Sequence, residues 1–107
     1  MASGLNGQSF AFQGYLSPKR PELARDLRRL EQSVWQQNQT QIFIETPYRS
    51  QMVLEVALES LRPDTMFVVA QDITGNQELI KGQTIKQWKK SPLPALQKLP
   101  AVFLIGK

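Results

Sequence analysis

The 107-residue sequence contains neither cysteine nor histidine. The absence of cysteine excludes disulfide scaffolds, zinc knuckles, thiolate nucleophiles and iron–sulfur sites. The absence of histidine removes the most common general base, the usual catalytic triad and the most common metal ligand. No apolar run approaches the roughly 20 residues of a membrane span, and the N-terminus does not have the pattern of a signal peptide. We therefore expect a cytoplasmic protein with no membrane contact and no metal site.

The composition that remains is that of one globular domain. Hydrophobic residues make up 41% of the chain and charged residues 21%, a balance that supports one core. The net charge of +4 allows an anionic partner such as nucleic acid, but it also fits an ordinary basic surface. The basic residues gather in two segments, Lys19, Arg20, Arg25, Arg28 and Arg29 in the first and Lys86, Lys89 and Lys90 in the second.

Strands and helices alternate along the chain. The aromatic, alternating segment 10–16 predicts a strand, and leucines at helical spacing after Pro21 predict a helix to about Gln37. A short strand over 42–44 precedes a second helix, which Thr46 would cap and Pro47 would open. The remaining elements are a strand over 66–70, an edge strand over 78–81, a helix after Thr84 and a last strand over 101–105.

This order predicts an α/β fold in which helices flank a mixed five-stranded sheet. The continuous apolar runs 66–70 and 101–105 predict strands that are buried on both faces. Ser3-Gly4 has the pattern of a helix end, although no helix is predicted before it, so we expect the natural chain to extend further back. The sheet core is predicted to consist of Phe12, Ile42, Ile44, Phe67, Val69, Val102 and Leu104.

The segment 42–49 is the best candidate for a site, because a buried strand ends there and a helix begins at once. Ligands of open α/β sheets bind at the carboxyl ends of strands, and helix N-termini offer free N–H groups. Glu45 could accept a hydrogen bond from a ribose hydroxyl or an amine. Arg49 opposes the helix dipole, which indicates a role elsewhere. The alternative is an ordinary strand–cap–helix connection with Glu45 in solvent.

A similar change from apolar to polar follows the strand over 66–70. Asp72 and Thr74 would lie near the same edge as Glu45 if both strands run parallel; alternatively, Asp72 and Gly75 only shape a turn. No glycine-rich phosphate loop and no nucleophile elbow is present. Glu55 and Glu59 are expected on a solvated helix face rather than as a catalytic pair, so no catalytic residue is assigned.

The basic helix also allows two interpretations. Arg25, Arg28 and Arg29 could contact phosphates, as in a stand-alone RNA-binding module. Alternatively, they form a solvated face that pairs with the interleaved acidic residues of the same helix, Glu22, Asp26 and Glu31. A dimerisation domain is a third possibility, which an exposed apolar patch would favour.

Four segments in order, 10–16, the basic helix, 42–49 and 68–74, resemble the tetrapyrrole (corrin/porphyrin) methylase superfamily. Its branch of small-subunit ribosomal RNA 2′-O-methyltransferases is the most similar. At the segment 10–16 this branch carries glycine-phenylalanine-leucine-proline. At 42–49 it carries glutamate-serine-proline-histidine-arginine, and at 68–74 alanine-arginine-glutamate-leucine-threonine. The chain departs from that branch at four positions, so ribosomal RNA and a tetrapyrrole both stay open as substrates. These positions are Ser17 for proline, Tyr48 for histidine, and Gln71 and Asp72 for arginine and glutamate.

The resemblance implies a two-domain, S-adenosylmethionine-dependent methyltransferase, commonly a homodimer, with the cofactor in the cleft between the domains. The chain resembles the C-terminal domain only, so the N-terminal methylase domain is an expected partner and the chain alone is expected to be inactive. The resemblance implies that residues 1–8 are the remnant of the interdomain linker helix and that 9–107 are the C-terminal methylase domain. Methyl transfer depends on positioning and is compatible with the lack of histidine. The resemblance assigns the cofactor to Glu45, Thr46, Pro47, Ile73, Thr74, Pro100 and Ala101, and the substrate to Tyr48, Arg49 and Asp72.

Overall fold

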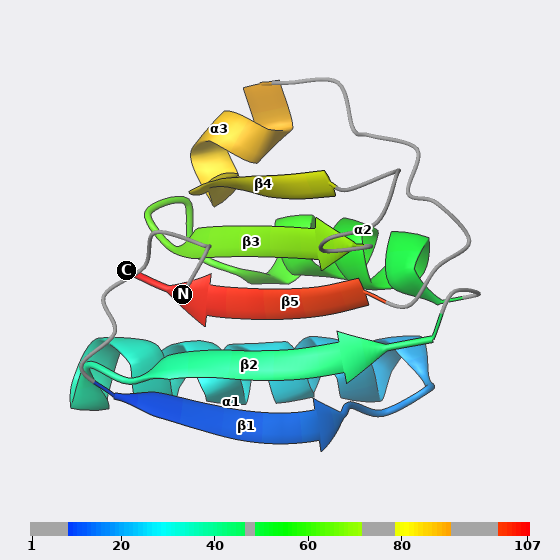
Figure 1. Cartoon of the computed structure of the whole chain (residues 1–107), viewed down its shortest axis with the longest axis horizontal. Helices are drawn as coiled ribbons and strands as arrows, with labels where there is room; N and C mark the ends of the chain where they lie inside the picture. The colour runs from blue at the N-terminus through cyan, green and yellow to red at the C-terminus, as the bar shows by residue number, and fades with distance from the viewer. Residues whose placement is uncertain (1–8, 47–48, 72–78, 91–100) are drawn as a thin grey trace.

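The computed structural model describes residues 9–46, 49–71, 79–90 and 101–107. It contains a five-stranded mixed sheet and three helices, which confirms the predicted fold class and the predicted order of elements (Figure 1). The expected linker remnant, 1–8, lies outside the described residues. The elements are β1 (Phe10–Tyr15), α1 (Arg20–Gln37), β2 (Thr40–Glu45), α2 (Ser50–Ser60), β3 (Met66–Gln71), β4 (Leu79–Thr84), α3 (Ile85–Lys90) and β5 (Ala101–Gly106).

The last strand of the chain occupies the centre of the sheet. The strand order is β1-β2-β5-β3-β4, and β5 pairs antiparallel with both β2 and β3. β1 runs parallel to β2, and β4 runs antiparallel to β3. Because β5 is antiparallel to both of its neighbours, β2 and β3 point in the same direction. Their carboxyl ends therefore lie at one edge of the sheet, with the beginning of β5 between them.

The two long helices cover the same face of the sheet. Figure 1 shows α1 behind β1 and β2 and α2 behind β3 and β5. Each helix buries a stripe of apolar side chains at helical spacing, such as Leu23, Leu27 and Leu30 in α1. The short α3 packs beside β4, where Trp88 is fully buried and its Nε1–H donates to the carbonyl oxygen of Phe67 at 2.8 Å. None of the helices in the described part combines the length and apolar character needed to cross a membrane.

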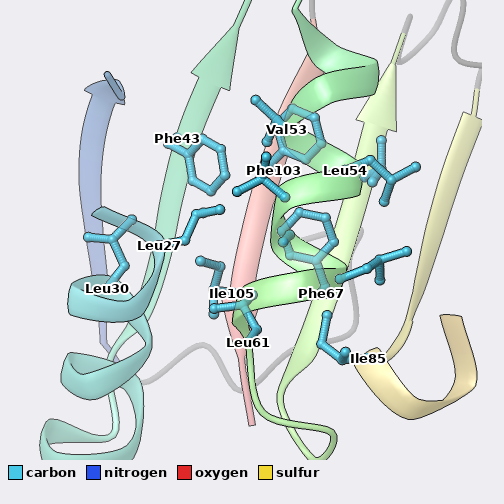
Figure 2. Packing of buried hydrophobic residues seen from close by; sticks show 14 of the residues in the cluster. Leu27, Leu30, Phe43, Val53, Leu54, Leu61, Phe67, Ile85, Phe103 and Ile105 are labelled. Atoms are coloured by element: carbon cyan, nitrogen blue, oxygen red, sulfur yellow. The ribbon is translucent and has the colours of Figure 1, made fainter. Parts of the chain in front are cut away.

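Three phenylalanines from neighbouring strands form the centre of the core (Figure 2). Phe103 of β5 stacks on Phe43 of β2, with ring centroids 5.1 Å apart, and on Phe67 of β3, at 5.6 Å. All three side chains are completely buried. Stacked aromatic pairs contribute about 0.5–1.5 kcal/mol beyond the area that they bury. The stack therefore joins the three central strands through side chains as well as backbone hydrogen bonds.

The predicted core is correct at three positions and wrong at four. Phe67, Val69 and Leu104 are buried, as predicted, and nearly all residues of β3 and β5 are buried. Phe12 is 67% exposed, and Ile42, Ile44 and Val102 are only half-buried. Successive side chains of a strand point to opposite faces, and the helices cover the face that carries Phe43 and Phe103. Alternation indicates which residues share a face, but it does not indicate which face the helices cover.

One further prediction needs correction. The second helix begins at Ser50 with Arg49 as its N-cap residue, three positions later than Pro47. The carbonyl oxygen of Thr46 accepts the Arg49 N–H at 3.1 Å and the Ser50 hydroxyl at 3.0 Å, so a turn precedes the helix. Tyr15, at the end of β1, is 64% exposed, whereas Trp88 is completely buried.

Replacing the central phenylalanine should destabilise the chain much more than replacing an exposed one. Phe103→Ala removes a completely buried ring from the stack and is expected to lower the free energy of unfolding by about 3–5 kcal/mol. Phe12→Ala should change it by less than about 0.5 kcal/mol, because the Phe12 side chain is mostly exposed. Urea unfolding at low micromolar protein concentration measures both values. Similar losses for both variants would contradict the assignment of the covered face.

Candidate functional site at the carboxyl ends of β2 and β3

The ends of β2 and β3 meet the beginning of β5 at one edge of the sheet. Glu45 pairs with Ala101, and Ala101 pairs with Gln71 on its other side. Because neighbouring strands are about 4.8 Å apart, the backbones of Glu45 and Gln71 lie roughly 10 Å from each other. This register confirms the expectation that the two strand ends share an edge. We call these four residues, Glu45, Thr46, Gln71 and Ala101, the rim.

The Glu45 carboxylate is buried. The residue is 1% exposed, so the interpretation that placed it in solvent is wrong. Its Oε1 accepts a hydrogen bond from the Thr46 N–H at 2.8 Å. Its Oε2 lies 3.6 Å from Nη2 of Arg49 and has no hydrogen-bond partner among the described atoms. A buried carboxylate therefore orders the backbone at the end of β2 and leaves one acceptor oxygen without a hydrogen bond.

Arg49 connects two loops at this edge. Its Nη2 donates to the carbonyl oxygen of Ser17 at 2.8 Å while it pairs with Glu45. Ser17 is itself fixed by two carboxylates of α1: its N–H donates to Asp26 at 3.0 Å and its hydroxyl to Glu22 at 2.8 Å. The unfavourable position of Arg49 at the helix N-terminus is thus offset by its contacts. The side chain fastens the β1–α1 connection to the β2–α2 connection.

Ion pairs neutralise part of the basic first helix. Arg20 lies 3.9 Å from Glu55 and 3.3 Å from Glu59. Both glutamates are about half exposed or more, so they lie on a solvated helix face, as expected. Arg29 pairs with Asp26 at 3.9 Å, whereas Arg25 and Arg28 make no ion pair within the described ranges. Such surface pairs contribute little to stability.

The structure places four of the ten residues that the resemblance assigned. Glu45, Thr46 and Ala101 lie together at the rim, and Arg49 contacts Glu45. Sequence reasoning missed Gln71 as a residue of this edge; it is 1% exposed and lies at the end of β3. Gln71 and Glu45 both pair with Ala101, and only the strand register of the folded sheet shows this. The other six lie outside the described residues: Pro47, Tyr48, Asp72, Ile73, Thr74 and Pro100.

Comparisons with known proteins define the class of fold. No protein-family model matches the sequence, and no curated protein matches it. The fold is similar to part of the crystal structure of the methyltransferase CobJ: the match covers 99% of this chain and 44% of CobJ, with 20% sequence identity and a TM-score of 0.58. The chain thus spans less than half the length of CobJ.

A more distant likeness involves the uroporphyrin-III C-methyltransferase from Thermus thermophilus. Its complex with S-adenyl homocysteine is 13% identical over 99% of this chain and 48% of that one, with a TM-score of 0.46. Its native form is 14% identical over 99% of this chain and 46% of that one, with a TM-score of 0.44. Of these matches, the one to CobJ shows a likeness of fold.

The buried carboxylate at the rim should contribute more to stability than an exposed one. Glu45→Ala leaves the Thr46 N–H without its acceptor and Arg49 without its ion-pair partner, and we expect a loss of about 1–3 kcal/mol in the free energy of unfolding. Glu55→Ala, at an exposed position of α2, is the matched control and should cost less than about 0.5 kcal/mol. Denaturant unfolding compares the two. Equal effects would mean that Glu45 does not order this edge.

Proposed function

We propose that the chain is the C-terminal domain of an S-adenosylmethionine-dependent methyltransferase of the tetrapyrrole methylase type. In this proposal the rim forms one wall of the cofactor cleft, and an N-terminal methylase domain supplies the other. The observation that carries the proposal is the register of the rim, in which the ends of β2 and β3 flank Ala101 within a fold that matches CobJ over 99% of the chain. Ligands of open α/β sheets bind outside such strand ends.

The chemistry of the rim fits a cofactor that carries hydroxyl and amino groups. Thr46 is exposed directly after β2. Ala101 places no bulky side chain between the two strand ends. Glu45 Oε2 is an acceptor without a hydrogen-bond partner in the described part of the chain. Ribose hydroxyls and an amino group are hydrogen-bond donors of the kind that the Glu45 carboxylate oxygen would accept.

The side chains around the rim would act by positioning. Bound S-adenosylmethionine supplies the activated methyl group. Transfer of a methyl group from a sulfonium needs alignment of donor and acceptor more than it needs a proton-transferring side chain. Glu45 and Arg49 hold the end of β2 and the Ser17 loop in place before any ligand binds. A prearranged backbone of this kind reduces the reorganisation that binding and reaction require.

Two acceptor classes follow from the proposal, ribosomal RNA and a tetrapyrrole. Gln71 and Asp72 differ from the ribosomal RNA branch, which favours the tetrapyrrole class. The chain alone provides only one wall of the proposed cleft. It should therefore lack methyl transfer activity towards either acceptor.

Weak binding of a cofactor product at the rim tests the proposal. Titration of the ¹⁵N-labelled chain with S-adenosylhomocysteine should shift the backbone amide resonances of Thr46, Gln71 and Ala101. Saturation is expected only at millimolar ligand, a binding free energy near −4 kcal/mol or weaker, because one wall of the cleft is absent. Calorimetry at micromolar concentrations should detect no binding heat.

Internal controls make this experiment decisive. The indole N–H of Trp88, buried beside β4, should not move during the titration. If millimolar ligand shifts no rim resonance, the location of the cofactor wall is wrong. If calorimetry finds micromolar affinity, or if the chain transfers methyl groups alone, the need for a second domain is contradicted.

A further inference from the structure

A hollow of about 270 Å³ lies at the end of the sheet opposite the rim. The last turns of α1 and the α2–β3 connection form it, near the beginnings of β2 and β3 and the end of β5. Six-residue strands separate the hollow from the rim by roughly 20 Å. We call it the Trp35 hollow; its lining residues are Arg28, Glu31, Gln32, Trp35, Gln36 and Arg62.

Three cationic groups converge on this hollow. The guanidinium carbon of Arg62 lies 4.6 Å from the centroid of the Trp35 ring, and Nζ of Lys107 lies 5.7 Å from the same centroid. Arg28 belongs to the lining. None of the three has an ion-pair partner among the residues that the structure describes. Cation–π contacts at exposed sites contribute about 0.5–1 kcal/mol, so the donors of these groups remain available for stronger, charge-assisted hydrogen bonds.

Glu31, the one carboxylate among the described lining residues, is already hydrogen-bonded to neighbouring groups of the hollow. Glu31 is 6% exposed, and its Oε2 accepts the Arg62 N–H at 2.7 Å and the Thr65 hydroxyl at 2.5 Å. The Thr65 hydroxyl oxygen also accepts the Trp35 Nε1–H at 3.0 Å. Glu31 thus fixes both the backbone of Arg62 and the ring of Trp35. The hollow therefore has a prearranged wall and an excess of positive charge.

We propose that the Trp35 hollow binds the phosphate group of a small organic phosphate, such as a nucleotide or a sugar phosphate. Guanidinium groups bind phosphate oxygens through paired N–H donors, and the hollow has two guanidinium groups, those of Arg28 and Arg62. The side-chain amides of Gln32 and Gln36 can donate to or accept from the attached group. A volume of 270 Å³ far exceeds the roughly 10–15 Å³ that a cavity needs to hold one water, so it accommodates more than a single tetrahedral anion.

The indole N–H resonance of Trp35 reports on this hollow directly. We would titrate the ¹⁵N-labelled chain with inorganic phosphate, with adenosine monophosphate and with sodium chloride of matched ionic strength. Both phosphates should shift the Trp35 resonance in a saturable manner, whereas chloride should not. Trp88, the second tryptophan, is completely buried and bonded to Phe67, so its resonance should stay in place and report that the fold is intact.

Substitutions in and beside the lining give matched variants. Arg62→Gln and Arg28→Gln should each weaken binding of adenosine monophosphate about tenfold or more, because each removes charge-assisted hydrogen bonds. Arg29→Gln removes a positive charge from the same helix outside the lining, where Arg29 pairs with Asp26, and should change the affinity less than twofold. Equal losses of affinity in all three variants would mean that binding depends only on net charge, which would overturn the proposal.

Two more outcomes would contradict the proposal. A Trp35 shift no larger than that in matched chloride would mean that no phosphate site exists in this hollow. A single-stranded uridine oligonucleotide without terminal phosphates is a further probe. If it moves the Trp35 resonance and adenosine monophosphate does not, the surface binds nucleic acid and not a small phosphate. S-adenosylhomocysteine should leave Trp35 unaffected, which separates this test from that of the rim.

Discussion

The arrangement of the molecule depends on the insertion of β5 between β2 and β3. Each of these two strands comes from its own strand–helix unit, and they do not pair with each other. The last strand joins them by antiparallel pairing on both sides and by the stack of Phe103 on Phe43 and Phe67. Because one strand separates them, β2 and β3 end at the same edge with Ala101 between them. The rim therefore exists only when the end of the chain has completed the sheet.

The two ends of the sheet use the same physical device. At the rim, the buried Glu45 accepts the N–H of Thr46, and at the opposite end the buried Glu31 accepts the N–H of Arg62. A buried carboxylate is tolerated when hydrogen bonds and nearby cations compensate for its lost hydration. In both places the compensation comes from a connection between elements, which becomes ordered as a result. The chain thus presents fixed backbone at both ends of the sheet.

The sequence predicted what depends on local patterns and failed where tertiary packing decides. Helical spacing of leucines and the positions of prolines gave the order of the elements, and the rule for parallel strands placed Glu45 and the end of β3 at one edge. The covered face was wrong because β2 reads Ile42-Phe43-Ile44, apolar on both sides, so alternation could not indicate where the helices pack. The burial of Glu45 depends on Arg49, which the loop at Ser17 holds in place. The Trp35 hollow was not predicted because Arg28, Arg62 and Lys107 meet only in the folded chain.

The packing between the rim and the Trp35 hollow determines whether the two proposed sites influence each other. β3 and β5 are buried along almost their whole length, and the phenylalanine stack lies between the two ends. Energetic coupling over such a distance requires an element with two alternative arrangements that both ligands bias. A close-packed stack of large rings resists such rearrangement, because any shift would open cavities beside it. Perturbations this far apart without shared partners are usually additive, so occupation of one end should leave the affinity of the other nearly unchanged.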